Sequence, residues 1–270
     1  MKSEIVHNIE IPKIGFGTWK IGGDSSPVRS RDSQSLAAIR SALDLGYTHF
    51  DTAEMYAAGH AEEIIGQAVR EAGTPREKLF ITSKVKPSNL RYSDVLKSCE
   101  ASLKRLGMDY VDLYLIHWPQ IGMNLKDTFR ALNKLARDGK VKHLGVSNFN
   151  LKLLKESQEY SETPIITDQV PYSLSDRSYV KNGVLEYCQQ NNILVTAYSP
   201  IDVGRLKASA ALKSVAEAHN TTPFQIALAW LVSQPRVIAI PASLNPKHQE
   251  ENLSAVDIAL SDEEMRQLTK

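Results

Sequence analysis

Four side chains capable of acid–base chemistry each occur at or just past the end of a predicted β-strand. Asp51 and Tyr56 lie in HFDTAEMY, Lys84 in LFITSKV and His117 in VDLYLIHW. In an eight-stranded βα barrel such strand ends converge on one mouth, so we expect the four side chains to meet there. A lysine ammonium beside a tyrosine lowers the pKa of the phenol, which is ordinarily near about 10. The group therefore predicts a tyrosine acidic enough to exchange its proton near neutral pH.

These residues have complementary roles in the reduction of a carbonyl group. Asp51 would hold Lys84, and the charge of Lys84 would lower the pKa of Tyr56. Tyr56 would then protonate the substrate oxygen as hydride reaches the carbon, while His117 orients that oxygen. Taken singly, Asp51 could be a helix cap, and Tyr56 and His117 could be packed rings. Lys84 is harder to explain by packing, because a buried unpaired charge is costly.

A metal site is an alternative for the same region. His49 and Asp51 are two positions apart in a predicted strand and would point to the same side, and His117 could join them as a zinc ligand. Neither an HxH nor an HExxH spacing occurs, and a metal would leave Lys84 and Tyr56 unexplained. We therefore predict that the site holds no metal.

Short apolar runs alternate with amphipathic stretches along the whole chain. Predicted strands are Ile14–Thr18, Thr48–Thr52, Leu79–Val85, Val111–His117, His143–Ser147, Ile166–Val170, Leu194–Ser199 and Val237–Pro241. Predicted helices are 33–46, 62–72, 93–106, 127–138, 150–160, 178–191, 208–219 and about 246–253, with a last helix near 261–269. EIVHN and IEIPK predict an N-terminal hairpin that could close the bottom of a barrel. The alternation predicts an α/β fold, a (β/α)8 TIM barrel, with residues 1–270 as a single domain.

Composition and charge exclude several other classes of protein. The formal net charge is +1 and no block of like charges occurs, so we expect neither nucleic acid nor a membrane surface as a partner. The N-terminus lacks an apolar signal core, and the longest apolar run, Ile226–Val232, is too short to span a membrane. Cys99 and Cys188 fall on separate helices and predict free thiols in the cytoplasm. No large apolar stripe is left over, so a monomer is expected.

Eight ordered motifs resemble those of the aldo-keto reductase family. They are GFGTW at 15–19, DTAEMY at 51–56, SKV at 83–85, LIHW at 115–118, GVSNF at 145–149, DQVPY at 168–172, AYSP at 197–200 and IP…EN at 240–252. The resemblance implies Asp51, Tyr56, Lys84 and His117 as the catalytic residues, with Tyr56 as general acid. It also implies an extended NADP(H), with NAD(H) also plausible, across the barrel mouth. In agreement, Gly15–Lys20 lacks the third glycine of a Rossmann fingerprint.

The resemblance also assigns the residues around the cofactor. Ser147, Asn148 and Gln169 would hold the nicotinamide carboxamide, and Tyr198 would stack on its ring. The remaining predicted cofactor residues are Thr18, Trp19, Ser199, Ile201, Ser243, Asn245, His248, Glu251 and Asn252. Asn245 followed by proline is a helix-start signature, and a helix N-terminus offers backbone N–H groups to a phosphate.

The sequence departs from the family pattern where an adenosine 2′-phosphate would lie. Relatives that prefer NADPH usually carry lysine and arginine where this chain has Ala242 and His248. We therefore predict a weakened NADPH preference. Trp19 and Trp118 would wall the substrate pocket. The sequence thus predicts an enzyme that reduces aldehydes or ketones, sugars among them, to alcohols. The alternatives are a non-catalytic, cofactor-binding protein on the same fold and a metal-dependent barrel hydrolase.

Overall fold

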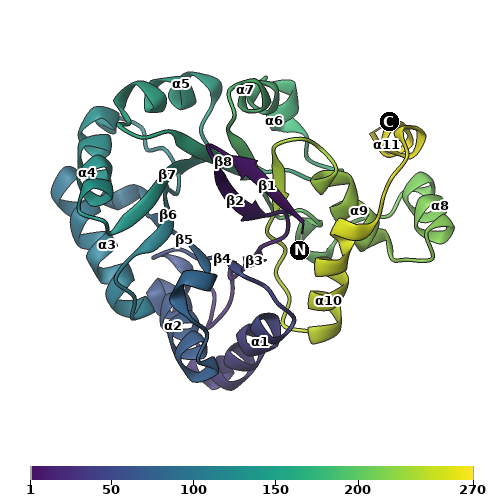
Figure 1. Ribbon diagram of the computed structural model, residues 1–270, viewed down its shortest axis with the longest axis horizontal. Coiled ribbons are helices and arrows are strands. Elements are labelled where there is room, and N and C mark those ends of the chain that lie inside the picture. The colour runs from purple at the N-terminus through teal and green to yellow at the C-terminus, as the bar shows by residue number, and fades with distance from the viewer. Residues whose placement is uncertain (1, 270) are drawn as a thin grey trace.

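The computed structural model describes residues 2–269 and shows a ring of parallel strands enclosed by helices (Figure 1). The eight-stranded sheet runs in chain order and every neighbouring pair is parallel. Its strands are β3 (Phe16–Gly17), β4 (His49–Asp51), β5 (Phe80–Val85), β6 (Val111–Ile116), β7 (Val141–Ser147), β8 (Ile165–Pro171), β9 (Leu194–Tyr198) and β10 (Val237–Ala239). The predicted parallel sheet is confirmed.

The first and last strands meet across a short seam. Ile14 and Ala239 form a parallel bridge, and the Gly17 N–H donates to the carbonyl of Pro241 at 3.0 Å. A Cβ atom at Gly17 would lie 2.6 Å from the backbone oxygen of Ile240. Only glycine permits this close approach, so the closure of the (β/α)8 barrel depends on it.

Helices lie around the outside of the sheet. They are α1 (Asp32–Asp44), α2 (His60–Ala72), α3 (Tyr92–Leu106), α4 (Leu125–Arg137), α5 (Leu151–Tyr160), α6 (Ser178–Lys181), α7 (Val184–Gln190), α8 (Ala210–Ala218), α9 (Pro223–Val232), α10 (Pro246–Ser254) and α11 (Asp262–Thr269). In α3, Val95, Cys99, Leu103 and Leu106 are buried at the i, i+4, i+8 and i+11 spacing of one helical face.

Two helix predictions were wrong. The predicted helix 178–191 is interrupted at Gly183, which adopts a φ of +82°, and so forms α6 and α7. The sequence did not predict α9. All residues of Ile226–Val232 are buried, so α9 has no polar face in that stretch and no amphipathic period. Its start is nevertheless encoded, because Thr222 and Gln225 form a capping box.

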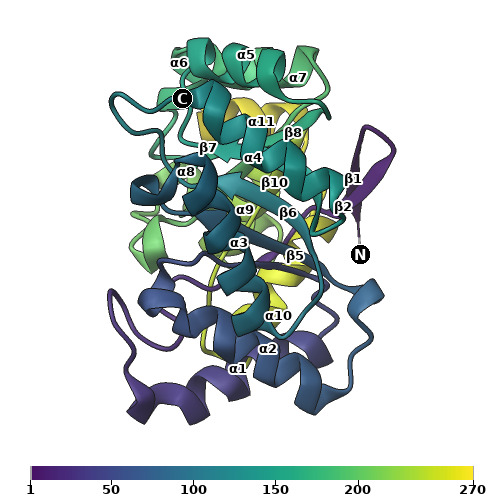
Figure 2. The ribbon, with the colours of Figure 1, turned by 90° about the vertical axis from the view of Figure 1, so that its left-hand side faces the viewer.

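An antiparallel hairpin closes the bottom of the barrel, as predicted. It consists of β1 (Ser3–Val6) and β2 (Ile9–Pro12), joined by His7 and Asn8, both with positive φ, as a two-residue type I′ turn requires. Val6 and Ile11 pack against barrel side chains that include Leu113, Ile166 and Leu194. The hairpin lies across the barrel in Figure 1 and projects from one end of it in Figure 2.

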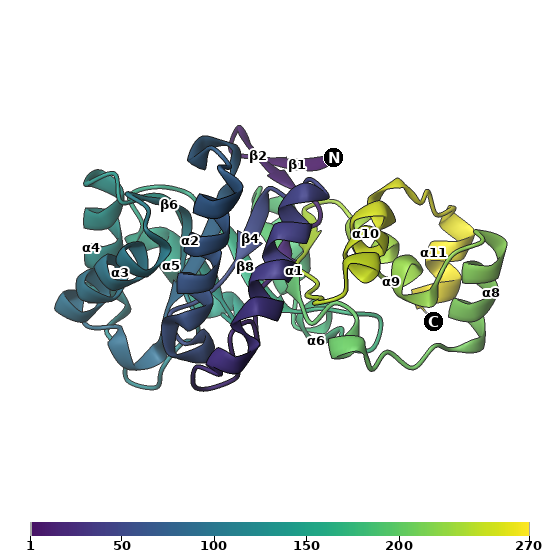
Figure 3. The ribbon, with the colours of Figure 1, turned by 90° about the horizontal axis from the view of Figure 1, so that it is seen from below.

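The C-terminal helix predicted from the sequence is present as α11. It lies beside α8, at one end of the molecule (Figure 3). Leu212, Val215, Ala216 and Ile226 form a small core there, separate from the main one. Within residues 2–269, no helix is long and apolar enough to cross a membrane. Cys99 and Cys188 are buried free thiols.

Candidate active site

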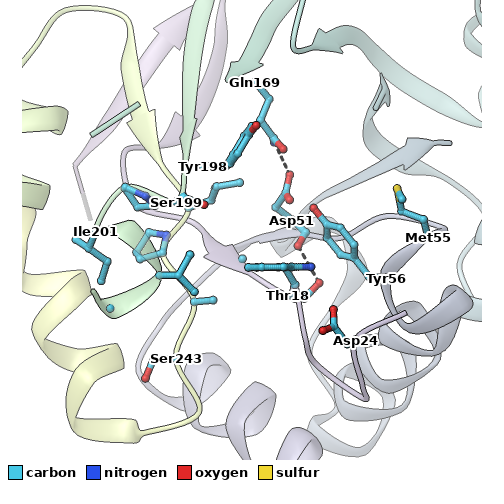
Figure 4. A pocket seen from close by; sticks show the side chains of 18 of the residues that line it. Thr18, Asp24, Asp51, Met55, Tyr56, Gln169, Tyr198, Ser199, Ile201 and Ser243 are labelled. Carbon is cyan, nitrogen blue, oxygen red and sulfur yellow. Dashed lines mark hydrogen bonds between the residues drawn. The ribbon is translucent and has the colours of Figure 1, made fainter. Parts of the chain in front are cut away.

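A pocket of about 1270 Å³ opens at the carboxyl ends of the barrel strands (Figure 4). Most of the predicted site residues line it: Thr18, Trp19, Asp51, Tyr56, His117, Trp118, Asn148, Gln169, Tyr198, Ser199, Ile201, Ser243, His248, Glu251 and Asn252. Three predicted residues do not line it, namely Lys84, Ser147 and Asn245. The loops after separate strands therefore bring most of the predicted residues to one cavity.

A buried ion pair lies beneath the tyrosine. Lys84 is fully buried, and its Nζ lies 2.5 Å from Asp51 Oδ1, 2.8 Å from the Thr52 carbonyl oxygen and 3.3 Å from the Tyr56 hydroxyl. Asp51 Oδ2 accepts a hydrogen bond from Gln169 Nε2 at 2.7 Å. The ammonium thus has three oxygen partners, and both carboxylate oxygens are bound.

The protonation states follow from burial and these contacts. Burial lowers the pKa of Lys84, but Asp51 and Tyr56 together, through charge and hydrogen bonds, raise it more, so the ammonium stays charged. Burial raises the pKa of Tyr56, Lys84 opposes this, and the net pKa is above the ordinary phenol value. As predicted, the charge of Lys84 lowers the pKa of Tyr56. The prediction of an unusually acidic tyrosine is nevertheless wrong, because the cost of desolvating the phenolate is larger than the effect of the ammonium. Tyr56 therefore keeps its proton at neutral pH.

His117 lies beside the tyrosine as a neutral imidazole. Its ring centroid is 5.5 Å from that of Tyr56, with the rings at 76°. Burial, and then the charge of Lys84, lower the pKa of His117 to about 3. His117 Nδ1 is buried and has no hydrogen-bond partner within the described residues. The pocket therefore contains two neutral side chains, a phenol and an imidazole, that can both hydrogen-bond one oxygen atom.

The backbone after Tyr56 is held in an unusual conformation. Ala57, Ala58 and Gly59 all have positive φ, which is unfavourable for the two alanines. The Ala57 N–H donates to the carbonyl of Asp24 at 2.9 Å, and a Cβ at Gly59 would lie 2.5 Å from Arg105 Nε. The surrounding contacts thus fix a tight turn, and this turn returns the tyrosine to the mouth of the barrel.

Amide and hydroxyl groups form a network on the opposite wall. Asn148, with a φ of +61°, donates from Nδ2 to Ser147 Oγ at 2.8 Å and to the His117 carbonyl at 3.1 Å. Its Oδ1 accepts from the Tyr198 hydroxyl at 2.9 Å. Ser147 is fully buried and donates to the Gln169 carbonyl at 2.8 Å, so it braces the wall instead of lining it.

The far end of the pocket lies at the start of α10. Asn245 caps this helix by accepting from the Lys247 N–H at 3.0 Å, and Pro246 is its first residue, as predicted. Asn245 itself does not line the pocket. Ala242 and His248 do, and both are exposed.

Several lining residues were missed in the sequence. Glu54 and Met55 lie within DTAEMY, and Lys86 lies two positions beyond Lys84, so strand alternation could have identified it. Arg105 comes from α3, and no motif marks it. The pocket also extends past the predicted segments to Asp24, Ser25, Val203, Gly204, Thr222 and Phe224.

Two residues of the alternative metal site, His49 and Asp51, have other partners. His49 Nε2 lies 3.1 Å from Thr82 Oγ1, and burial lowers the pKa of His49 to about 4. His49 does not line the pocket. Across the described residues, no three His, Cys, Asp or Glu side chains are grouped so that they could hold a metal ion.

Known proteins resemble the chain over nearly its whole length. The model of the Aldo/keto reductase family matches residues 13–270. Methylglyoxal reductase YeaE of Escherichia coli is 38% identical over 97% of the chain and 92% of its own length. Glyoxal reductase of Bacillus subtilis is 36% identical over 96% of the chain and 89% of its own length.

Solved structures give the same result. A thermostable aldo-keto reductase in complex with the inhibitor epalrestat superposes with a TM-score of 0.97 at 45% identity, covering 100% of the chain and 99% of that protein. An aldo/keto reductase of Klebsiella pneumoniae in complex with NADP and acetate superposes with a TM-score of 0.88 at 36% identity. The match covers 99% of the chain and 94% of that protein.

We predict that Lys84→Met lowers the free energy of unfolding by about 3–5 kcal/mol, because it leaves the Asp51 carboxylate buried without a counter-charge. The double variant Asp51→Asn/Lys84→Met removes both charges and should be more stable than Lys84→Met alone. Urea denaturation gives the free energy of unfolding of the original protein, the single variant and the double variant. Lys97→Met, at an exposed position on α3, is the control and should change stability by no more than about 0.5 kcal/mol. A comparably small loss in Lys84→Met would contradict the role of the pair.

Proposed function

The chain belongs to the aldo/keto reductase family, and from that premise we propose that it reduces aldehydes or ketones to alcohols with NADPH. The observation that supports this most directly is the charged Lys84 beneath Tyr56, with the neutral His117 beside it. This arrangement offers a proton and a second hydrogen bond to one carbonyl oxygen. Methylglyoxal is a suitable first substrate, because a relative is named for its reduction.

The pocket walls fit a nicotinamide dinucleotide. The Nε2 of Gln169 donates to Asp51, which leaves the side-chain oxygen Oε1 of Gln169 available to an amide group. The Tyr198 ring lines the same region and is fixed through its hydroxyl on Asn148. Gln169, Asn148 and Tyr198 would hold the nicotinamide, and Ser243, His248 and Asn252 the other end. The Klebsiella pneumoniae relative was solved with NADP. Bound there, the reduced cofactor supplies a hydride.

The side chains of the chain itself govern the proton. Tyr56 donates its hydroxyl proton to the carbonyl oxygen as negative charge develops on that oxygen. Lys84, fixed by Asp51, stabilises the phenolate that remains, so the charge of the ammonium acts on the product side of the step. The neutral His117 donates a hydrogen bond to the same oxygen and restricts its position.

We predict that Tyr56→Phe lowers kcat for methylglyoxal reduction by about 10²–10⁴-fold, because general acid catalysis supplies an effect of that size. Cofactor affinity should change little, since Gln169, Asn148 and Tyr198 are untouched. Steady-state kinetics and fluorescence titration measure the two effects. Tyr92→Phe, outside the pocket, is the matched control. A protein that binds NADPH and reduces no aldehyde before or after the substitution would instead be a non-catalytic binding protein.

We predict a flat pH profile for carbonyl reduction near neutrality. The pKa of His117 is lowered to about 3 and that of Tyr56 is raised above its usual value, so both side chains stay neutral at every pH between these two pKa values. From pH 6 to pH 8.5, kcat/KM should therefore vary by less than about threefold, since neither group titrates. Steady-state rates in buffers of constant ionic strength test this. A limb in this range that disappears in His117→Gln would show that the imidazole is charged in the working enzyme.

We predict dual use of NADPH and NADH. Ala242 and His248 line the far end of the pocket and supply neither an ammonium nor a guanidinium. Restoring both charges in Ala242→Lys/His248→Arg should raise the ratio of kcat/KM for NADPH over NADH by about 10- to 100-fold, because a charged hydrogen bond contributes about 1.5–3 kcal/mol. Glu250→Gln removes a negative charge from an exposed part of α10 and should leave the ratio unchanged. An unchanged ratio in the double variant would place the 2′-phosphate elsewhere.

A further inference from the structure

We propose that Lys86 and Arg105 form an anion-binding subsite beside Tyr56, which selects carbonyl substrates that carry a carboxylate at a distance from the carbonyl group. This inference rests on the proposed reductase function and specifies the class of substrate. Both residues line the pocket, together with Met55 and Ala58 of the segment around Tyr56. None of these four was assigned a role above in binding the cofactor or moving the proton.

The strand geometry places Lys86 on the side of the catalytic lysine. Lys84 lies in β5 and points into the barrel, and Lys86 follows two positions later in extended conformation, with φ −72° and ψ 156°. Side chains two apart on an extended chain point to the same side, roughly 7 Å apart. Lys86 therefore projects from the barrel rim above Lys84. It is partly buried, and its Nζ forms no hydrogen bond or ion pair within the described residues.

Arg105 lines the pocket from α3 and lies against Gly59, three positions after Tyr56. Its Nε donates to Glu62 Oε2 at 2.6 Å and its Nη2 to Ser102 Oγ at 3.2 Å. Glu62 is fully buried and also accepts from Ser83 Oγ at 2.6 Å. The guanidinium is thus fixed in direction while Nη1 has no partner in the part of the chain described, which leaves a preorganised donor.

Of the two cations only Arg105 is paired: the fully buried Glu62 forms an ion pair with its Nε, so Arg105 contributes the unpartnered Nη1 donor and Lys86 contributes the free charge of the subsite. Glu54 Oε1 already accepts from the Lys86 N–H at 2.6 Å, and Asn89 Nδ2 donates to the same carboxylate at 3.4 Å and 3.5 Å. No Glu54 oxygen lies within 4.0 Å of Lys86 Nζ. Asp24 also lines the pocket, and its backbone carbonyl accepts from the Ala57 N–H; in Figure 4 the Asp24 carboxylate lies below the Tyr56 ring and Met55 lies to the right of that ring. The available donors on the Met55 side are therefore positive.

The neighbouring apolar surface defines the rest of the substrate. Met55 and Trp118 line the pocket and are 43% and 44% exposed, so both offer apolar surface to the body of a substrate. A substrate with a carbonyl at Tyr56, an apolar body on this wall and a carboxylate at Lys86 would satisfy all three surfaces. Aromatic or aliphatic aldehydes with a terminal carboxylate have this chemistry.

The test compares 4-carboxybenzaldehyde with its methyl ester, which keeps the aldehyde and the ring and removes the charge. The acid should have the higher kcat/KM, and the acid-to-ester ratio should fall by about tenfold in Lys86→Met, the expected loss for one charged hydrogen bond. Lys86→Arg should retain most of the ratio. Lys104→Met, an exposed lysine of α3 that removes the same charge outside the pocket, should leave the ratio at its original value.

A binding measurement separates this inference from the proposed function. Quenching of tryptophan fluorescence by 4-(hydroxymethyl)benzoate and by its methyl ester reports affinity without turnover. Tighter binding of the acid that is lost in Lys86→Met supports the subsite even if no aldehyde is reduced, an outcome that would overturn only the reductase proposal. Equal preference for acid and ester in the original protein, or an equal loss in Lys86→Met and Lys104→Met, would overturn the subsite while methylglyoxal reduction remained intact.

Discussion

The buried contact between Asp51 and Lys84 is the interaction on which the site depends. Two charges at the end of a barrel strand are stable only when each has several partners, because removing them from water is costly. Here the ammonium has three oxygen partners, and the carboxylate is also bound by Gln169 from the opposite side of the barrel. This requirement fixes β4, β5 and β8 relative to one another, and so fixes the floor of the pocket.

The barrel excludes water from beneath that floor. The hairpin closes the bottom with Val6 and Ile11, and Gly17 lets β3 and β10 approach closely enough to complete the ring. Burial raises the pKa of Tyr56 and lowers that of His117, so both side chains are neutral. The fold therefore sets the protonation state of the site, because packing around the barrel mouth buries these two side chains.

The sequence predicted this architecture well where a local pattern carried the information. Apolar runs identified the eight strands, and the polar residues at their ends identified Asp51, Tyr56 and His117 as neighbours. It failed where the outcome depended on a balance or on tertiary contact. The pKa of Tyr56 is set by two opposing effects, because burial raises it and the charge of Lys84 lowers it. The extent of burial cannot be predicted from the spacing of residues in the sequence. Helix α9 was missed because its apolar stretch is buried on all sides and lacks a period. Ser147 and Asn148 are adjacent, yet only Asn148 lines the pocket.

The pocket combines a fixed centre with more variable ends. At the centre, Asn148 and Gln169 each bond more than one neighbour, so a substitution there would disturb several contacts at once. At the ends, Lys86, Ala242 and His248 line the pocket, and the side chains of Lys86 and His248 form no hydrogen bond within the described residues. Changes at such positions alter charge without disturbing the ion pair or the amide network. If the cofactor phosphate and the substrate bind at these ends, as proposed, their recognition can change independently of the ion pair. This independence follows from where the hydrogen bonds lie.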